Sequence, residues 1–219
     1  MKRKNKNFFK VAIDSPAASG AGTLAKALSI HYNLAYLDTG KAYRLVALYK
    51  LKNPKKFNLK FIKEKIKNLK IKHLNHKLLL SDEVGTEASI IAKNKSIRNL
   101  IHSFQINFAY NPPKKYNGSV LDGRDITYKI VPDADFKFFV TANIKTRAMR
   151  RYKELKGLKK SISFKEVLKS IKNRDKSDYN RNISPLKKTK DSLLINTTKL
   201  SKRACFLKIR KIIDRKIKI

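Results

Sequence analysis

The sequence predicts an α/β fold in which a parallel sheet is flanked by helices. Five short runs of the kind that form buried strands occur along the chain, at residues 8–13, 35–37, 119–121, 136–140 and 193–196. Helical patterns separate these runs, and the first of them, at 24–30, follows a turn of small residues. Strands that alternate with helices favour a parallel sheet, because parallel strands need a crossover connection. A chain of 219 residues suits one domain, or one domain with insertions.

The composition indicates a folded protein that works in a reducing compartment. Hydrophobic residues make up 42% of the chain, which is enough to build a core. The one cysteine, Cys205, has no partner for a disulfide within the chain, so a cytoplasmic location is expected. No apolar run approaches the roughly 20 residues of a membrane span. The basic residues 1–7 precede an apolar run that is too short for a signal peptide, so no association with a membrane is predicted.

The net charge of +37 at pH 7 is the most extreme feature of the composition. A surface this basic attracts polyanions of any kind, including nucleic acids, anionic lipids and nucleotides. Most of the positive charge comes from lysines spread along the whole chain, and asparagine and isoleucine are frequent too. Such a mixture also arises from a genome-wide bias in composition. The charge therefore leaves both interpretations open, selected polyanion binding and compositional bias.

Residues 14–23, with the sequence DSPAASGAGT, form a turn of small residues between the first strand and the first helix. Backbone N–H groups at such a helix N-terminus bind phosphate. The phosphate-loop pattern G-x-x-x-x-G-K-[ST] is incomplete here, because Ser15 occupies the position of the first Gly and Ala21 that of the Lys. By itself, the segment is compatible with a phosphate loop and equally with a plain strand–turn–helix corner.

Residues 50–115 are rich in lysine and are predicted to form an insertion between strands of the sheet. The elements predicted within it are a helix, a pair of short strands and a long interrupted helix, over residues 61–69, 71–80 and 83–110. His73 and His76 lie in the predicted strand pair. We interpret them as loop residues, because no cysteine or carboxylate cluster accompanies them as metal ligands.

Two clusters of polar residues are well placed for a functional site. The strand at 119–121 ends in Asp122, Gly123, Arg124 and Asp125. In an open α/β sheet, ligands bind outside the carboxyl ends of the strands. The helix after the strand at 136–140 carries three arginines on one face, Arg147, Arg150 and Arg151. Guanidinium groups so close together repel one another unless an anion neutralises them, although a solvated face is the alternative.

Five stretches of the chain carry motifs whose order is informative. They are Ile13 to Thr23; Leu37-Asp38-Thr39-Gly40 with Tyr43-Arg44; Asp122-Gly123-Arg124-Asp125; Pro132-Asp133-Ala134 with Arg147, Arg150 and Arg151; and Arg174-Asp175 with Asp178, Arg181 and Pro185-Leu186. In this order they resemble bacterial cytidylate kinase, of the nucleoside monophosphate kinase group of P-loop proteins. The resemblance spans nearly the whole chain. It implies a P-loop three-layer fold with a core at residues 1–49 and 116–219, a monophosphate-binding insertion at 50–115 and a short lid at 145–175.

The resemblance implies transfer of the terminal phosphoryl group of ATP to CMP or dCMP, giving CDP or dCDP in pyrimidine metabolism. The donor phosphates are expected on the loop residues Ser15, Pro16, Ala17, Ala18, Ser19, Gly20, Ala21, Gly22 and Thr23. Mg²⁺ bound with ATP is expected, as in phosphoryl transfer generally. Its predicted ligands, mostly through water, are Asp14, Thr23 and Asp122.

By the same resemblance, ten residues match those that bind the acceptor nucleotide: Thr39, Tyr43, Arg44, Ser89, Arg98, Arg124, Asp125, Arg174, Asp178 and Arg181. Ser89, Arg98 and Asp125 among them match residues that read the cytosine edge. Arg44 and Arg181 match residues that grip the monophosphate, where a planar guanidinium suits phosphate oxygens. The predicted catalytic residues are Lys41, Arg44 and the three lid residues Arg147, Arg150 and Arg151, which would close over the transferring group.

The missing loop lysine is the main departure from the resemblance. Ala21 removes a cation that spans the donor's terminal phosphates. We hypothesise that Lys41 supplies this charge, with Lys26 as a weaker alternative. Two other functions stay open: a catalytically impaired P-loop relative that binds nucleotide or RNA through its basic surface, and a kinase of another monophosphate such as UMP or of a shikimate-like acid. The expected partners are ATP and CMP or dCMP, with no specific nucleic acid, no membrane and a monomeric state.

Overall fold

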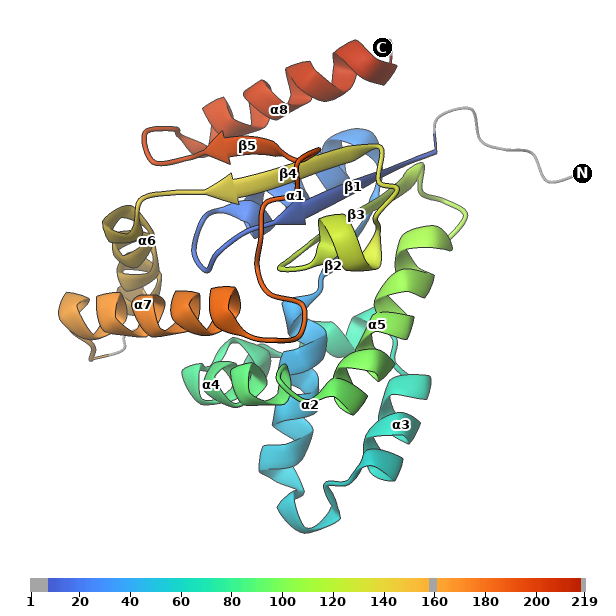
Figure 1. Cartoon of the computed structure of the whole chain (residues 1–219), viewed down its shortest axis with the longest axis vertical. Coiled ribbons are helices and arrows are strands. Elements are labelled where there is room, and N and C mark those ends of the chain that lie inside the picture. Colours follow the sequence, from blue (N-terminus) through green and yellow to red (C-terminus); the bar gives the residue numbers. More distant parts are fainter. Residues whose placement is uncertain (1–7, 158–160, 218–219) are drawn as a thin grey trace, which may run out of the picture.

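The computed structural model describes residues 8–157 and 161–217 of the chain. At its centre lies a sheet of five parallel strands in the order β2-β3-β1-β4-β5 (Figure 1). The strands are β1 (Phe9–Asp14), β2 (Ala35–Asp38), β3 (Gly118–Gly123), β4 (Phe136–Thr141) and β5 (Leu193–Asn196). They coincide with the five predicted runs, so the α/β class with a parallel sheet is confirmed.

Helices cover both faces of the sheet, as Figure 1 shows. The four that pack directly on it are α1 (Ala21–Tyr32), α2 (Gly40–Lys52), α5 (Lys95–Tyr110) and α8 (Lys202–Ile217). On one face, α1 and α8 share a core with Val11 and Phe138. On the other face, α2 and α5 share a core with Ala12 and Leu121. Because both faces are covered, the strand sequences are almost continuously apolar.

Every regular element between α2 and β3 is helical. These elements are α3 (Leu59–Lys67), α4 (Asp82–Ile91), α5 and three 3₁₀ turns, η1 (Pro54–Lys56), η2 (Ile71–Asn75) and η3 (Lys77–Leu80). The strand pair predicted at 71–80 is therefore wrong. His73 Nδ1 accepts a hydrogen bond from the backbone N–H of Lys70 at 3.1 Å. His76 Nδ1 accepts one from Leu78 at 3.2 Å, so each ring satisfies a local backbone donor and the segment needs no neighbouring strand.

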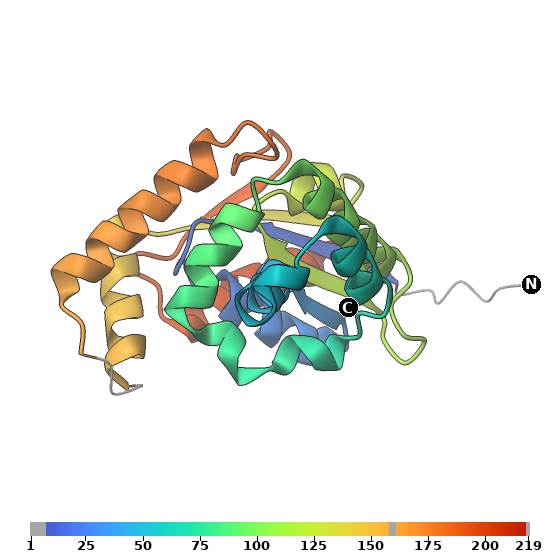
Figure 2. The same cartoon turned by 90° about the horizontal axis from the view of Figure 1, so that it is seen from below.

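Two helices form a pair beside the turn that follows β1. They are α6 (Ile144–Gly157) and α7 (Phe164–Asn180), and Figure 2 shows the pair next to the helices of the insertion. Ala17 of the turn lies in one apolar cluster with Ala148 and Ile171. The C-terminal part of α7 is a charged stretch, from Arg174 to Asn180. Residues 158–160 of the predicted lid lie outside the described part of the chain.

The last helix packs through one of its sides. Cys205, Ile209 and Ile213 of α8 are buried. Leu207 is 45% exposed, because it lies on the outer side of the helix. Over residues 8–157 and 161–217, no helix combines the length and the apolar character that crossing a membrane requires.

Candidate active site

The turn between β1 and α1 leaves the N-terminus of α1 open. Gly20 and Thr23 are exposed, and Gly20 has a φ of 93°, a left-handed conformation that glycine adopts at little cost. The first N–H groups of a helix have no partner within the helix, and the helix dipole adds positive potential there. The segment therefore has the geometry of an anion site, as the phosphate-loop interpretation requires.

Ser15, which replaces the first glycine of the phosphate-loop pattern, causes no backbone strain. Positive φ values in this turn occur at Ala18 and Gly20 and not at Ser15. The backbone N–H of Ser15 donates to the carbonyl oxygen of Gly123 at 3.1 Å, which fastens the loop to the end of β3. This departure from the pattern therefore leaves the loop conformation available.

Arg147 of α6 holds the loop from the side of its carbonyl groups. Its Nη1 donates to the carbonyl oxygen of Ala17 at 3.1 Å, and its Nε donates to that of Ala142 at 2.9 Å. Two further hydrogen bonds, of 2.9 and 2.6 Å, join its guanidinium to the carboxylate of Asp175 in α7. Arg147 is only 5% exposed, so these bonds satisfy a buried cation.

Arg150 and Arg151 have partners of their own. Arg150 Nη1 donates to the carbonyl oxygen of Ser19 at 3.1 Å, and its Nη2 donates to that of Thr197 at 2.7 Å. Arg151 pairs with Glu154 at 3.0 Å. In this structure Arg147 and Arg151 pair with carboxylates, whereas Arg150 donates to neutral oxygens. Arg147 and Arg150 thereby hold the carbonyl groups of the loop.

Asp122 and Asp38 lie side by side at the carboxyl ends of β3 and β2, where they are partners in the sheet register. Asp122 Oδ1 is buried and has no hydrogen-bond partner in the described part of the chain. Removal from water, together with the charge of Asp38, raises the pKa of Asp122 to about 8. The ammonium group of Lys41 acts in the opposite direction. Two carboxylates in such a position favour a cation next to them.

Asp14 has a different environment from this pair. Its Oδ1 accepts a hydrogen bond from the N–H of Ile126 at 2.8 Å. Its Oδ2 accepts two from Thr127, one from the N–H at 2.9 Å and one from Oγ1 at 2.6 Å. These donors belong to a π-helical turn, η4 (Ile126–Ile130), that follows β3. With 0% exposure, Asp14 has no room for the predicted magnesium water, and the structure gives it the role of tying β1 to η4 instead.

Arg98, His102 and Asp125 meet in a buried cluster between α5 and the end of β3. Arg98 Nη1 donates to Asp125 Oδ2 at 2.9 Å, and His102 Nε2 lies 3.2 Å from the same oxygen. The guanidinium of Arg98 also lies over the ring of Tyr43, 5.1 Å from its centroid. Burial acts to raise the pKa of Asp125, but the hydrogen bond from His102 and the charge of Arg98 hold that pKa below its usual value. The carboxylate is therefore ionised.

Three more arginines gather around one carboxylate, that of Asp178. Arg124 Nε donates to Asp178 Oδ2 at 2.6 Å, and Arg181 Nη1 lies 3.6 Å from Asp178 Oδ1. Arg174 forms no hydrogen bond or ion pair with the described residues, and burial together with Arg124 lowers its pKa to about 10. Arg181 Nη2 is buried and has no partner among the described residues. The surplus of positive charge favours an anion here.

Arg44 and Ser89 lie on the side of the insertion. Arg44 Nη1 donates to the carbonyl oxygens of Leu79 and Ser81, at 2.7 and 3.1 Å. A Cβ at Gly85 would come within 2.9 Å of Arg44 Nη2, so this glycine leaves room for the guanidinium against α4. Ser89 Oγ donates to the carbonyl oxygen of Gly85, one turn earlier in α4. The charge of Arg44 also helps to lower the pKa of Arg174.

Three residues that the sequence analysis did not assign belong to these groups. Asp38 received no role of its own, and its Oδ1 accepts a hydrogen bond from the N–H of Gly40 at 3.1 Å. His102 lies one helical turn after Arg98, a spacing that could have indicated a shared face. Gln105 Nε2 donates to the carbonyl oxygen of Thr39 at 3.4 Å, while its Oε1 is buried without a partner in the described chain.

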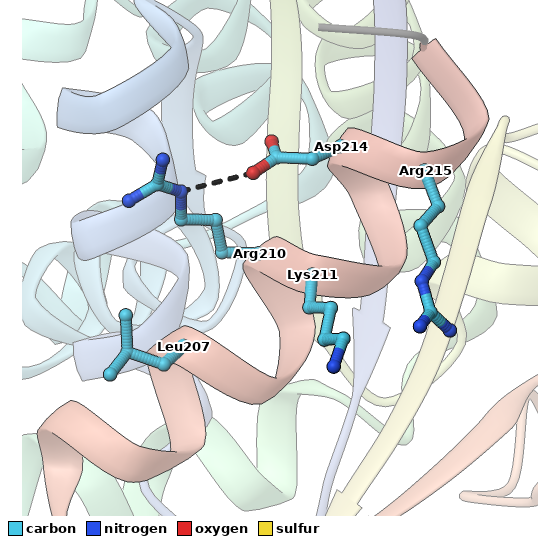
Figure 3. A pocket seen from close by; sticks show the side chains of 5 residues that line it. All are labelled: Leu207, Arg210, Lys211, Asp214 and Arg215. Carbon is cyan, nitrogen blue, oxygen red and sulfur yellow. Dashed lines mark hydrogen bonds and ion pairs between the residues drawn. The ribbon is translucent and has the colours of Figure 1, made fainter.

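A surface hollow lies over α8, away from all of these residues. Figure 3 shows its lining, which is formed by Leu207, Arg210, Lys211, Asp214 and Arg215. Its volume is about 330 Å³, and a hydrogen bond of 3.0 Å joins Arg210 Nε to Asp214. None of the predicted site residues contributes to it.

The sheet, the open N-terminus of α1 and the arginines gathered beyond the carboxyl ends of the strands define a nucleotide-binding phosphotransferase of the P-loop class. The sequence comparison is more specific. The chain belongs to the cytidylate kinase family, whose sequence model matches residues 11–215.

Individual relatives agree with this assignment. The cytidylate kinase of Bartonella tribocorum is 43% identical over 216 residues, covering 96% of this chain and 97% of the relative. That of Thermosipho melanesiensis is 39% identical over 220 residues, covering 96% of this chain and 99% of the relative. A solved structure of an uncharacterized protein from Eubacterium ventriosum has a TM-score of 0.56 at 20% identity, covering 94% and 98% of the two chains, which shows a shared fold. The prediction of an enzyme, a kinase of this family, is confirmed, and the impaired relative is not favoured.

Proposed function

We propose that the chain transfers the terminal phosphoryl group of ATP to CMP or dCMP, releasing ADP with CDP or dCDP. The observation that carries this proposal is the arginine cluster of Arg124, Arg174 and Arg181, where Arg174 has no hydrogen-bonded partner in the described chain and Arg181 Nη2 is buried and unpaired. Arg124 directly follows Gly123, whose carbonyl oxygen holds Ser15 of the loop. A second phosphate-bearing molecule beside the loop supplies the charge that this cluster lacks.

The donor nucleotide belongs on the turn between β1 and α1. Its phosphates lie on the backbone N–H groups of residues 15–23, at the open N-terminus of α1. Mg²⁺ fits the oxygen atoms of Asp38, Asp122 and Thr23, since Asp122 Oδ1 is buried without a partner among the described residues. When bound with ATP, magnesium neutralises charge on the phosphates during transfer.

The acceptor nucleotide belongs between the insertion and α7. Its phosphate is held by Arg44 and Arg181, and its sugar lies near Arg174 and Asp178. Forked guanidinium groups suit phosphate oxygens because they donate two parallel hydrogen bonds. Arg174 forms no hydrogen bond with the described residues, so it can bind the nucleotide without breaking one.

The base of the acceptor is read at the cluster of Arg98 and Asp125, with Ser89, Thr39 and Tyr43 nearby. Cytosine presents a carbonyl acceptor and an amino donor on one edge, which match a guanidinium and a carboxylate. Arg98 and Asp125 are fixed for this purpose, because each has a second partner that orients it. The buried hydroxyl of Tyr43 has no hydrogen-bond partner in the described part of the chain and is free for the nucleotide.

Positioning explains the transfer step, since phosphoryl transfer needs little covalent help from the protein. Arg147 and Arg150 keep the loop in shape through the carbonyl groups of Ala17 and Ser19. Arg151, which pairs with Glu154 at 3.0 Å, is the lid residue that we assign to the transferring group. Approach of the lid also excludes water, which would compete with the acceptor.

One assay tests the proposal. The purified chain is incubated with ATP, Mg²⁺ and each of CMP, dCMP, UMP, AMP and GMP in turn, and ADP is measured. ADP formation is expected with CMP or dCMP and at background level with the others. ADP formation with another monophosphate only, or none with any, contradicts the proposal. Salt-sensitive RNA binding without turnover would favour the binding-protein alternative.

A matched pair of variants tests the acceptor site. Arg181→Met removes a cation from the arginine cluster, and the KM for CMP is expected to rise about 100-fold, as for a lost charged hydrogen bond. Arg210→Met, in the hollow over α8, is the control and should leave the KM unchanged. Equal effects of the two substitutions would contradict the assignment. A cytoplasmic location and a monomeric state stay predictions, and light scattering during gel filtration tests the second.

A further inference from the structure

The phosphate loop lacks a cation of its own. Ala21 takes the place of the lysine that reaches the β- and γ-phosphates in phosphate loops, and its methyl group carries no charge. Two cations of α6, Arg147 and Arg150, are already engaged, because they donate to the carbonyl oxygens of Ala17 and Ser19. A cation from another element can supply the charge that is missing at position 21.

The start of α2 is fastened to the same strand as the phosphate loop. The N–H of Ser15 donates to the carbonyl oxygen of Gly123, and the N–H of Thr39 donates to that of Asp122, both at 3.1 Å. These acceptors are adjacent residues of β3, which lies between β1 and β2. The phosphate loop and the start of α2 are thus separated by about 10 Å, the width of two strand spacings.

Lys41, the second residue of α2, is half-buried on this side of the sheet. It follows Asp38 by three residues, and Asp38 is the register partner of Asp122 in the sheet. Asp122 in turn lies against the loop, since its Oδ2 is 3.5 Å from the position of a Cβ on Gly22. Lys41 forms no hydrogen bond or ion pair with residues 8–157 or 161–217, so its charge is available.

We propose that Lys41 supplies, from α2, the positive charge that a phosphate-loop lysine supplies from α1, and that it contacts the terminal phosphates of bound ATP. The inference rests on the proposed function, because it requires ATP in the loop. A lysine can take over this role from a different helix, because its compact ammonium group lies at the end of a flexible side chain. An oxygen of the CMP phosphate attacks the γ-phosphorus, the bond to the β–γ bridging oxygen breaks, and Lys41 stabilises the charge that ADP carries away.

Lys41 also has a simpler interpretation. It lies near the paired carboxylates Asp38 and Asp122, so its charge could serve only to neutralise them. The two roles differ in what they do to nucleotide affinity. A residue that contacts the terminal phosphates strengthens the binding of ATP much more than that of AMP, whereas a residue that only neutralises carboxylates does not distinguish the two nucleotides in this way.

The test uses Lys41→Ala, Lys41→Met and two matched lysine controls. Lys26→Ala removes an exposed lysine of α1, and Lys52→Ala removes an exposed one at the far end of α2. The turnover of both Lys41 variants is expected to fall about 10³-fold, the lower end of what a transition-state cation contributes. Their affinity for ATP should fall at least tenfold, with the affinity for AMP unchanged. Both controls should behave as wild type, and circular dichroism should show folded protein throughout.

A second substitution restores the charge from its usual place. Ala21→Lys in the Lys41→Ala background is expected to recover turnover and ATP affinity. Loss of turnover and of ATP affinity in Lys41→Ala alone already supports the proposal, with or without this recovery. A normal rate in Lys41→Ala, or a lost rate with normal ATP affinity, overturns it. So does loss of activity in Lys26→Ala alone. If the wild-type chain phosphorylates no monophosphate, the proposed function fails, and the ATP affinities still decide the role of Lys41.

Discussion

Arg147 and Asp175 face each other across α6 and α7 and share two hydrogen bonds, of 2.9 and 2.6 Å. The same guanidinium donates to the carbonyl oxygen of Ala17 in the phosphate loop. Because α7 also carries Arg174 and Asp178, this pair links the position of the proposed acceptor site to the shape of the loop proposed to bind the donor. The loop and the arginine cluster are therefore expected to respond together when the pair is broken.

Asp175→Ala leaves Arg147 buried without its counter-charge. The two side chains are 6% and 14% exposed, so the free energy of unfolding is expected to fall by about 3–5 kcal/mol, as for other broken buried pairs. Asp191→Ala is the matched control, since Asp191 is 59% exposed in its pair with Lys137 and should contribute below about 1 kcal/mol. Denaturant unfolding measures both. A loss at Asp175 no larger than that of the control contradicts the structural role.

Gly20 and Gly22 are expected to differ when each is changed to alanine. Gly20 has a φ of 93°, so Gly20→Ala strains the loop and should destabilise the free protein by about 1–3 kcal/mol. A Cβ on Gly22 meets its nearest atoms at 3.4 and 3.5 Å, which is ordinary contact, so Gly22→Ala should leave unfolding unchanged and weaken only ATP binding. Thermal unfolding with and without ATP separates the two effects. Equal destabilisation of the free protein by both would contradict this assignment.

The sheet could be predicted because each strand is a short apolar run between helical segments, and burial on both faces makes such runs conspicuous. The segment at 71–80 could not. Its apolar residues and its two histidines have the spacing of a strand pair, but His73 and His76 bond to nearby backbone donors and stabilise 3₁₀ turns. Local bonds of this kind leave no periodic signal.

The position of Asp122 and Asp125 at the carboxyl end of the sheet could be predicted, because a short apolar strand directly precedes them. Helical periodicity correctly placed Arg147 and Arg150 on one face, but it carries no information about what lies opposite that face. Here the partners are carbonyl oxygens of the loop, which no side-chain pattern marks. Asp38 was missed for a related reason. It is the register partner of Asp122 on the neighbouring strand, and no sequence pattern marks that pairing.

Asp14 is expected to make stability depend on pH. Burial raises its pKa from 3.8 to about 6, against the effect of its hydrogen bonds to Thr127 and Ile126. The folded state thus holds the proton more tightly than the unfolded state. This tighter proton binding stabilises the folded state fully below about pH 4. The stabilisation is lost as the pH rises through about 6, and the free energy of unfolding then falls by about 3 kcal/mol for two pKa units.

Asp14→Asn removes this titration and serves as the reference. The free energy of unfolding of the wild type, minus that of Asp14→Asn, should fall by about 3 kcal/mol between pH 4 and pH 7. Urea unfolding at intervals of one pH unit measures it, and the subtraction cancels the groups that both proteins share. A difference that stays constant with pH would show that Asp14 has an ordinary pKa in the folded chain.

His102 is expected to affect the acceptor nucleotide and not the donor. Its Nε2 lies 3.2 Å from the Asp125 oxygen that also accepts from Arg98. His102→Leu keeps much of the volume but removes one of the two partners that orient this carboxylate. A buried polar group that loses a partner costs about 1–3 kcal/mol, so the KM for CMP should rise about 5- to 100-fold while the KM for ATP stays the same.

Ser103→Ala is the matched control for His102→Leu. Ser103 is the next residue of α5, is exposed, and donates only to the carbonyl oxygen of Asn99 in its own helix. Steady-state kinetics with CMP varied at saturating ATP, and then the reverse, separate the two KM values, while denaturant unfolding reports on the core. A purely structural His102 would lower stability and change both KM values together. A selective rise for CMP, absent in Ser103→Ala, identifies His102 as a residue that positions Asp125 for the base.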